Sequence, residues 1–108
     1  MDISVDFNRI SDWNSFHEVF SEVMGFPDFY GKNNNAWIDC MSYIDDKDAG
    51  MSKVTVKSGE SLTITVSGTE KATNSAAEVF LGFMEIVAAV NQRFIEVGSE
   101  TRLGVVAI

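Results

Sequence analysis

The chain has 108 residues, the size of a single domain, and 45% of them are hydrophobic, which is enough to build a core without a metal or a disulfide staple. Sixteen Asp and Glu residues against eight Lys and Arg residues give a net charge of -8, a field that repels phosphate backbones and attracts basic proteins. Composition therefore predicts one domain over residues 1–108 and argues against direct binding of nucleic acid.

The first quarter of the chain predicts a strand and a helix. Residues 2–7 alternate between polar and apolar side chains, with Ile3, Val5 and Phe7 on one side, which is typical of a strand. Residues 12–24 carry apolar side chains at helical spacing, between a Ser or Asp suited to an N-cap and a Gly that suits a helix end.

A turn-rich loop over residues 25–32 precedes a second helix. The loop carries three aromatic residues, so we expect aromatic side chains that are exposed or half-buried between two helices. The Asn residues at 33–35 suit N-cap positions, and the second helix is expected to run from there to about Ile44. An acidic loop follows, with Asp45, Asp46 and Asp48.

The second half of the chain predicts strands around one long helix. β-Branched residues alternate on both sides of a break at residues 58–60, which indicates a hairpin over residues 54–66. Residues 76–94 have apolar side chains around most of a helical surface, and residues 102–108 form a last strand expected to be covered on both faces. The order predicts an α/β fold, with a small, largely parallel sheet of three to four strands packed by about three helices.

The single cysteine, Cys40, and the single histidine, His17, limit the chemistry available to the protein. One thiol forms no intramolecular disulfide, and two side chains do not supply the four ligands of a structural zinc site. A lone His at helical spacing and a buried Cys are usually packed residues, and no nucleophile stands beside a base. We therefore expect no enzyme activity, no metal, no cofactor, and a reducing, cytoplasmic setting.

The sequence shows neither the pattern of a signal peptide nor that of a membrane-spanning helix. Residues 1–10 contain Asp2 and Asp6, whereas a signal peptide begins with basic residues and an apolar run. The most apolar stretch, residues 79–90, is shorter than the roughly 20 residues that span a bilayer, and it contains Glu85. We expect no export signal and no membrane partner.

Helical spacing divides the second helix into two faces. One face is apolar, with Trp37, Cys40, Met41 and Ile44. The opposite face is polar, with Asn35, Asp39, Ser42 and Asp46, and Ile38 lies on its shoulder beside Asp39. A solvated face on an ordinary amphipathic helix is one interpretation, and a binding surface is the other.

Three features favour the binding surface. Phe29 and Tyr30 in the preceding loop are rigid aromatic residues of the kind enriched in binding hot spots. The acids bunch around Asp39 and the loop after the helix, with only Lys32 and Lys47 as nearby cations in the sequence. Carboxylates along a helix face can also take the place of phosphates before the Arg and Lys residues of a nuclease.

Residues 25–40 carry a family resemblance. The run Gly-Phe-Pro-Asp-Phe-Tyr-Gly-Lys-Asn-Asn-Asn-Ala-Trp-Ile-Asp-Cys resembles the signature of the barstar family, in which Phe or Leu-Pro leads to Tyr-Gly-x-Asn, then Ala and Asp-Cys. The matched positions are Phe26, Pro27, Tyr30, Gly31, Asn33, Ala36, Asp39 and Cys40. Element order and length also fit, so the resemblance spans nearly the whole chain.

The resemblance implies a barstar-like inhibitor that inserts its second helix and the preceding loop into a ribonuclease active site, as an immunity protein or for self-protection. Asp39 would be the central anchor. Two positions depart from the family pattern. Barstar has a carboxylate where this chain has Asn35, and it has a hydroxyl group at the position of Phe29. A further contact near the start of the long helix stays open between Glu70, Asn74 and Glu78.

These observations predict a binding surface centred on the segment 30–46. The residues expected to contact a partner are Phe29, Tyr30, Asn33, Asn35, Ile38, Asp39, Ser42 and Asp46. The expected partner is a basic ribonuclease, bound by a protein that is a monomer when free. The alternative is a barstar-like binding module that regulates a different nuclease or a host protein.

Overall fold

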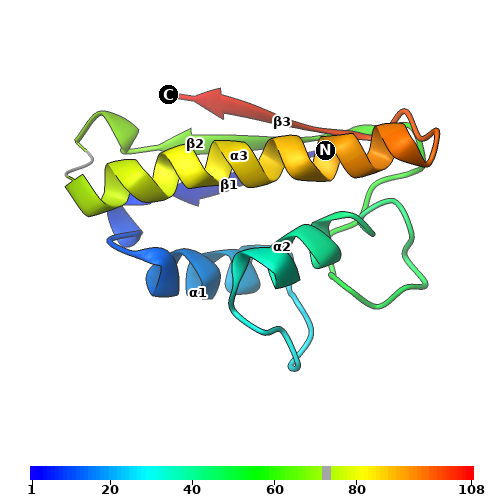
Figure 1. Ribbon diagram of the computed structural model, residues 1–108, viewed down its shortest axis with the longest axis horizontal. Coiled ribbons are helices and arrows are strands. Elements are labelled where there is room, and N and C mark those ends of the chain that lie inside the picture. The colour runs from blue at the N-terminus through cyan, green and yellow to red at the C-terminus, as the bar shows by residue number, and fades with distance from the viewer. Residues whose placement is uncertain (72–73) are drawn as a thin grey trace.

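Three parallel strands form the sheet, in the order β1-β2-β3 (Figure 1). The computed structural model describes residues 1–71 and 74–108. The strands are β1 Asp2–Asp6, β2 Ser61–Ser67 and β3 Arg102–Ala107. The helices are α1 Trp13–Met24, α2 Asn34–Met41 and α3 Asn74–Glu96, with the short 3-10 helices η1 Phe7–Arg9 and η2 Thr69–Lys71. The predicted α/β fold with a parallel sheet and three helices is confirmed.

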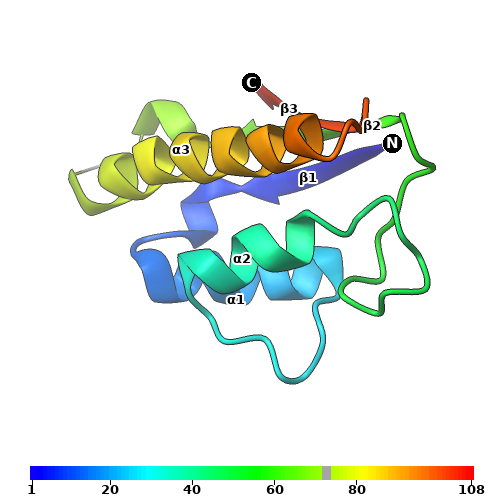
Figure 2. The ribbon, with the colours of Figure 1, turned by 45° about the vertical axis from the view of Figure 1, so that its right-hand side comes forward.

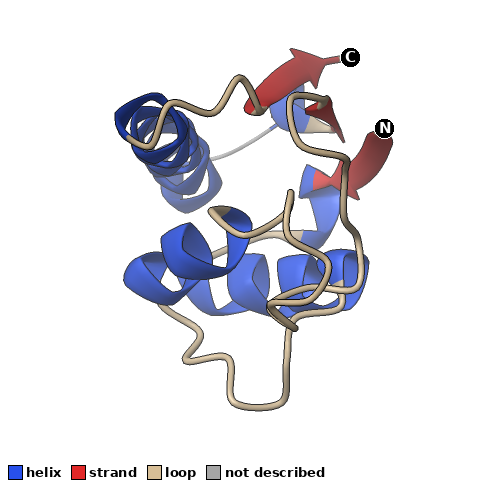
Figure 3. Cartoon of the chain, turned by 90° about the vertical axis from the view of Figure 1, so that its right-hand side faces the viewer, coloured by secondary structure: helices blue, strands red, loops and turns tan. Residues whose placement is uncertain are grey.

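All three α-helices lie on one side of the sheet, with α1 and α2 side by side below α3 (Figures 2 and 3). The register places Ile3 opposite Ile64 and Ile64 opposite Val105, so one apolar row crosses the sheet and faces the helices. The other face of β1 carries the exposed residues Asp2, Ser4 and Asp6. The sheet is therefore covered on one face, as its alternation of polar and apolar residues requires.

The expectation of cover on both faces of the last strand is wrong. β3 is an edge strand that pairs with β2 alone within the described sheet, and its burial falls off toward its end. Val106 lies on the outer face and is half exposed, whereas Leu103 on the inner face is buried. A continuous apolar run thus gave the wrong prediction because β-branched residues also occur on half-exposed strands.

The predicted hairpin over residues 54–66 is also wrong, because β2 is the central strand and both of its edges are already paired with β1 and β3. Residues 51–60 instead cross the ends of α1 and α2. The backbone N–H of Val54 donates to the carbonyl of Met24 (3.2 Å), and that of Val56 donates to Ile44 (2.8 Å). Val56 is buried there, so its apolar character reflects packing on helix ends and not strand pairing.

Local signals place α1 and α2 where the sequence predicts them. The Asp12 carboxylate accepts the backbone N–H of Ser15, whose side chain reaches back to the Asp12 backbone, and Gly25 ends α1 in the left-handed region at φ 66°. Asn33 caps α2 by accepting the Ala36 N–H at 2.8 Å. α2 ends at Met41, earlier than expected, and a tight turn then carries Ile44 into the core.

An aromatic cluster joins α3 to the rest of the molecule. Phe83 on α3 is fully buried, and its ring lies about edge-on or tilted against five others, with centroid distances of 5.6 to 6.1 Å. These neighbours are Phe7, Phe16, Phe20, Trp37 and Phe80. Next to Phe83, Gly82 lets Trp13 approach so closely that a Cβ would lie 2.4 Å from its ring. The cluster fixes how α1, α2 and α3 sit against one another.

Candidate functional site

The α2 helix presents two different faces, as its spacing predicts. Trp37, Cys40 and Met41 are buried in the core, while Asn35 and Asp39 are exposed. Asn33, at the N-cap, is exposed as well and uses its side-chain oxygen on the helix. We call the α2 face the set of residues that lie on or beside this polar side: Phe29, Asn33, Asn35, Ile38, Asp39, Ser42 and Asp46.

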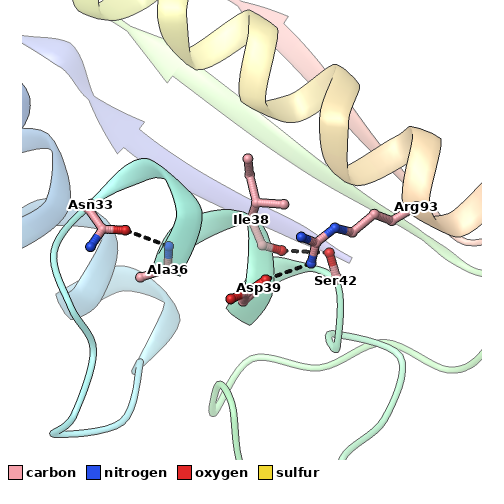
Figure 4. A network of polar contacts seen from close by, with 6 residues as sticks. All are labelled: Asn33, Ala36, Ile38, Asp39, Ser42 and Arg93. Atoms are coloured by element: carbon pink, nitrogen blue, oxygen red, sulfur yellow. Dashed lines mark hydrogen bonds and ion pairs between the residues drawn. The ribbon is translucent and has the colours of Figure 1, made fainter.

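Asp39 lies near the middle of the α2 face and forms an ion pair with Arg93 (Figure 4). Arg93 comes from the last turn of α3, and its Nη1 donates to Oδ1 of Asp39 at 2.7 Å. Both side chains are half exposed. Arg93 is not predicted from the sequence as a partner of Asp39, because the two residues are 54 positions apart.

Ile38 and Ser42 flank Asp39 along the chain. Ile38 is half-buried and packs against the core, so it offers an edge and not a whole side chain to a partner. The Ser42 hydroxyl donates to the backbone carbonyl of Ile38 at 2.6 Å, which occupies its proton and helps to end α2 (Figure 4). The Ser42 oxygen therefore remains as an acceptor of hydrogen bonds.

The loop before α2 divides its two predicted contact aromatics between surface and interior. Phe29 is 75% exposed, whereas Tyr30 is 8% exposed. The Tyr30 hydroxyl lies 2.6 Å from Nδ1 of His17, and burial raises the pKa of Tyr30 above its ordinary value. The structure thus places Phe29 on the α2 face and Tyr30 beneath it, as a support of the loop.

A shallow groove runs between Phe29 and Asp39. It is lined by Phe29, Tyr30, Gly31, Ala36, Asp39, Cys40 and Met51. Its walls are mostly apolar, with one carboxylate at the edge, which is an arrangement that suits the stem and the charged head of an Arg or Lys side chain. A long cationic side chain laid along the loop would thus meet Asp39.

His17 ties the loop to both helices. Its Nδ1 meets the Tyr30 hydroxyl, and its Nε2 lies 3.2 Å from the side-chain oxygen of Asn34. When Nε2–H donates to Asn34, Nδ1 can accept a hydrogen bond from the Tyr30 hydroxyl, so both hydrogen bonds fit a neutral ring. Burial lowers the pKa of His17, although the bond to Asn34 opposes this shift. The histidine is a packed residue, as expected for a lone His at helical spacing.

We predict that this histidine makes folding stability depend on pH. The ordinary pKa of His is 6.5, and the folded protein lowers it, so below pH 6.5 the unfolded chain binds a proton that the folded protein resists. The free energy of unfolding should therefore fall as the pH drops below 6.5. Urea unfolding at pH 7.0 and pH 5.5 checks this, with His17→Gln expected to lose less stability between the two pH values. Equal losses in both proteins would contradict it.

The acids that follow α2 have two different roles. The carboxylate of Asp45 is half-buried and accepts the hydroxyl of Thr101 at 3.0 Å and that of Ser99 at 3.3 Å, so it anchors the start of β3. Asp46 is exposed and accepts the backbone N–H of Asp48. Asp46 thus lines a surface groove together with Ser42 and Arg93, while Asp45 holds the fold together.

Two of the three candidates for a further contact near the start of α3, Glu70 and Glu78, have described side chains, and that contact stays a prediction. Glu70 in η2 and Glu78 near the start of α3 are exposed. A rise of 1.5 Å per residue puts Glu78 about 22 Å along the helix axis from Arg93, which borders the α2 face. The side chain of Asn74 lies outside the described residues. The end of α3, and not its start, is beside Asp39.

Three other features were sought in the described residues: a metal site, a reactive thiol and a membrane-spanning helix. Among residues 1–71 and 74–108 no group of three or more His, Cys, Asp or Glu side chains is arranged to hold a metal ion. Cys40 is buried, and burial together with the charge of Asp39 raises the pKa of its thiol, which disfavours the reactive thiolate. None of the helices in the described part has an apolar stretch long enough to cross a membrane.

Comparison with known proteins points to a single family. A family model described as barstar, the barnase inhibitor, matches residues 1–106. A comparison with curated proteins finds no match. Because the family model covers nearly the whole chain, with Asp39 and Cys40 inside the matched range, the chain belongs to the barstar family, which is a family of protein inhibitors and not of enzymes.

Proposed function

We propose that the α2 face binds a basic ribonuclease and closes its substrate cleft. The observation that carries this proposal is the placement of Asp39, a half-exposed carboxylate near the middle of the face, beside the apolar groove that starts at Phe29. Membership of a family described as barnase inhibitors supports a protein partner. In this proposal Tyr30 holds the loop in place from below and forms part of the groove that receives the partner's side chain.

The chemistry of such an interface is charge neutralisation and exclusion of substrate. A ribonuclease binds RNA phosphates with Arg, Lys and His side chains, and a fixed carboxylate can form the same charge-assisted hydrogen bonds. Asp39 and Asp46 supply carboxylates, while Asn33 and Asn35 supply neutral hydrogen-bonding groups. The protein needs no catalytic group of its own, since occupying the cleft is sufficient for inhibition.

We also propose a cellular setting for this activity. The protein acts in the cytoplasm, as an immunity protein or for self-protection against a ribonuclease, and is a monomer when free. The buried, unreactive thiol of Cys40 is compatible with a reducing compartment. Expression of the matching ribonuclease should be toxic to cells that lack this chain and harmless to cells that make it.

The net charge of -8 predicts electrostatic steering of the encounter. Charges are screened over about 8 Å at physiological ionic strength but over about 30 Å at 0.01 M. We expect the association rate constant with the ribonuclease to fall at least about tenfold between these two conditions, with little change in the dissociation rate. Stopped-flow mixing over a series of salt concentrations measures both rate constants. An association rate constant that does not change with salt concentration would contradict electrostatic steering.

The target class can be tested by affinity capture with defined nucleases. The immobilised protein is exposed in separate runs to catalytically inactive barnase, to other small basic ribonucleases and to a basic DNase. The proposal predicts that at least one ribonuclease is retained and that the free protein blocks RNA cleavage by its active form. Retention of the DNase alone would contradict a ribonuclease target and would favour regulation of a different nuclease.

A further inference from the structure

The carboxylate that the proposed function offers to a partner already holds a cation of the same chain. Arg93 Nη1, from the last turn of α3, donates to Oδ1 of Asp39 on α2 at 2.7 Å (Figure 4). A partner's Arg or Lys that approaches Asp39 competes for that oxygen. Binding at Asp39 is therefore an exchange of one cation for another, and not the filling of an empty site.

The exchange is physically easy, because the ion pair is held at the surface. The side chains of Arg93 and Asp39 are 50% and 53% exposed. Pairs with this exposure are screened by water and are held with little net free energy. A partner that buries Asp39 removes this screening, so its own cation gains more from the carboxylate than Arg93 does in the free protein.

The released Arg93 side chain also has another place to go. Arg93 lines a second groove together with the exposed acids Asp46 and Glu96. Glu96 is three residues further along the same helix, a spacing at which side chains meet. Arg93 lies in the last turn of α3, where the helix dipole also favours a cation. Leaving Asp39 thus does not leave the guanidinium without negative neighbours.

We propose that Arg93 is a built-in competitor that a partner's cation must displace from Asp39. This inference rests on the proposed use of Asp39 as the anchor of the interface. Arg93 weakens every cation at this position by the same factor, so the ratio of affinities between two partners does not change. A surface Lys that is only weakly attracted then stays unbound at ordinary protein concentrations, while a well-placed, desolvated Arg still binds. Arg93 therefore lowers the affinity of Asp39 for any cation of a partner, and only a partner with strong contacts of its own binds.

The test uses hexa-arginine peptide as a probe of cation binding at Asp39, so that it needs no ribonuclease. The dissociation constant is followed by NMR through the backbone amides of Asp39 and Ser42, in the whole protein. The variants are Arg93→Gln, Asp39→Asn and the double variant. Arg9→Gln is the matched control, because Arg9 forms an equally short ion pair with Glu22 (2.7 Å, 50% and 65% exposed) and its loss changes the net charge by the same amount.

We expect Arg93→Gln to bind the peptide two- to fivefold more tightly than Arg9→Gln, which corresponds to about 0.4 to 1 kcal/mol. This gain should vanish when Asp39 is already Asn. A gain no larger than that of Arg9→Gln, or a gain that survives in the double variant, would overturn the proposal. A chain that captures no ribonuclease but shows this pattern would refute the proposed function while leaving the competition at Asp39 established.

Discussion

Replacing Asp39 by Ala is expected to weaken binding of the target ribonuclease by at least about 30-fold, which corresponds to a hot-spot loss of about 2 kcal/mol. Asp39 is the carboxylate nearest the middle of the α2 face, and a partner that covers the face desolvates it together with the cation that it meets. Truncation removes the bond and leaves the partner's cation buried without a counter-charge. Calorimetric titration of the inactive ribonuclease measures the effect.

The same substitution should leave folding nearly unchanged. The ion pair with Arg93 is half exposed and adds little stability, and Ala is a better helix former than Asp by up to about 0.7 kcal/mol. Glu85→Ala is the matched control, because Glu85 is an exposed acid inside α3 and is not part of the α2 face. Equal binding losses for Asp39→Ala and Glu85→Ala would reduce the role of Asp39 to net charge.

Replacing Phe83 by Ala is expected to lower the free energy of unfolding by about 3 to 5 kcal/mol. Its ring is fully buried and touches aromatic rings from η1, α1, α2 and α3, so its removal leaves a cavity where these elements meet. Because Phe83 contacts Trp37 on the buried side of α2, the loss also loosens the helix that carries Asp39. Urea unfolding measures the change in stability.

Phe29→Ala is the control for this prediction, since it deletes the same ring at a site that is 75% exposed. We expect it to change stability by no more than about 0.5 kcal/mol and to weaken binding through the direct loss of a contact. A loss of stability in Phe29→Ala as large as in Phe83→Ala would mean that the loop before α2 is part of the core.

Local signals in the sequence account for most of the fold. Helix caps are short-range, so Asp12 and Asn33 mark the starts of α1 and α2 within a residue, and alternation identifies β1 and β2. The prediction of a hairpin is wrong because alternation of polar and apolar residues indicates that one side is buried, but it does not identify the element that covers that side. Val56 alternates with polar residues, but its backbone N–H pairs with Ile44 in the turn after α2 and not with a strand.

The candidate site could be predicted in part for the same reason. Residues contributed by α2 follow from helical spacing, so the exposure of Asn35 and Asp39 and the burial of Trp37 agree with expectation. The burial of Tyr30, in the loop before α2, involves His17, which lies 13 residues earlier on α1. The pair of Asp39 with Arg93 depends on how α3 packs over α2. Contacts between distant elements need the packed core and leave no periodic signal in the sequence.

We propose that this protein inhibits a ribonuclease by covering its substrate cleft with the α2 face. The most direct test is titration of a captured ribonuclease, held at a fixed concentration well above the dissociation constant, with fluorescent RNA as substrate. We predict that activity falls in a straight line and reaches zero at one inhibitor per enzyme. Activity that persists at an excess of inhibitor, while the two proteins remain bound to each other, would contradict the claim.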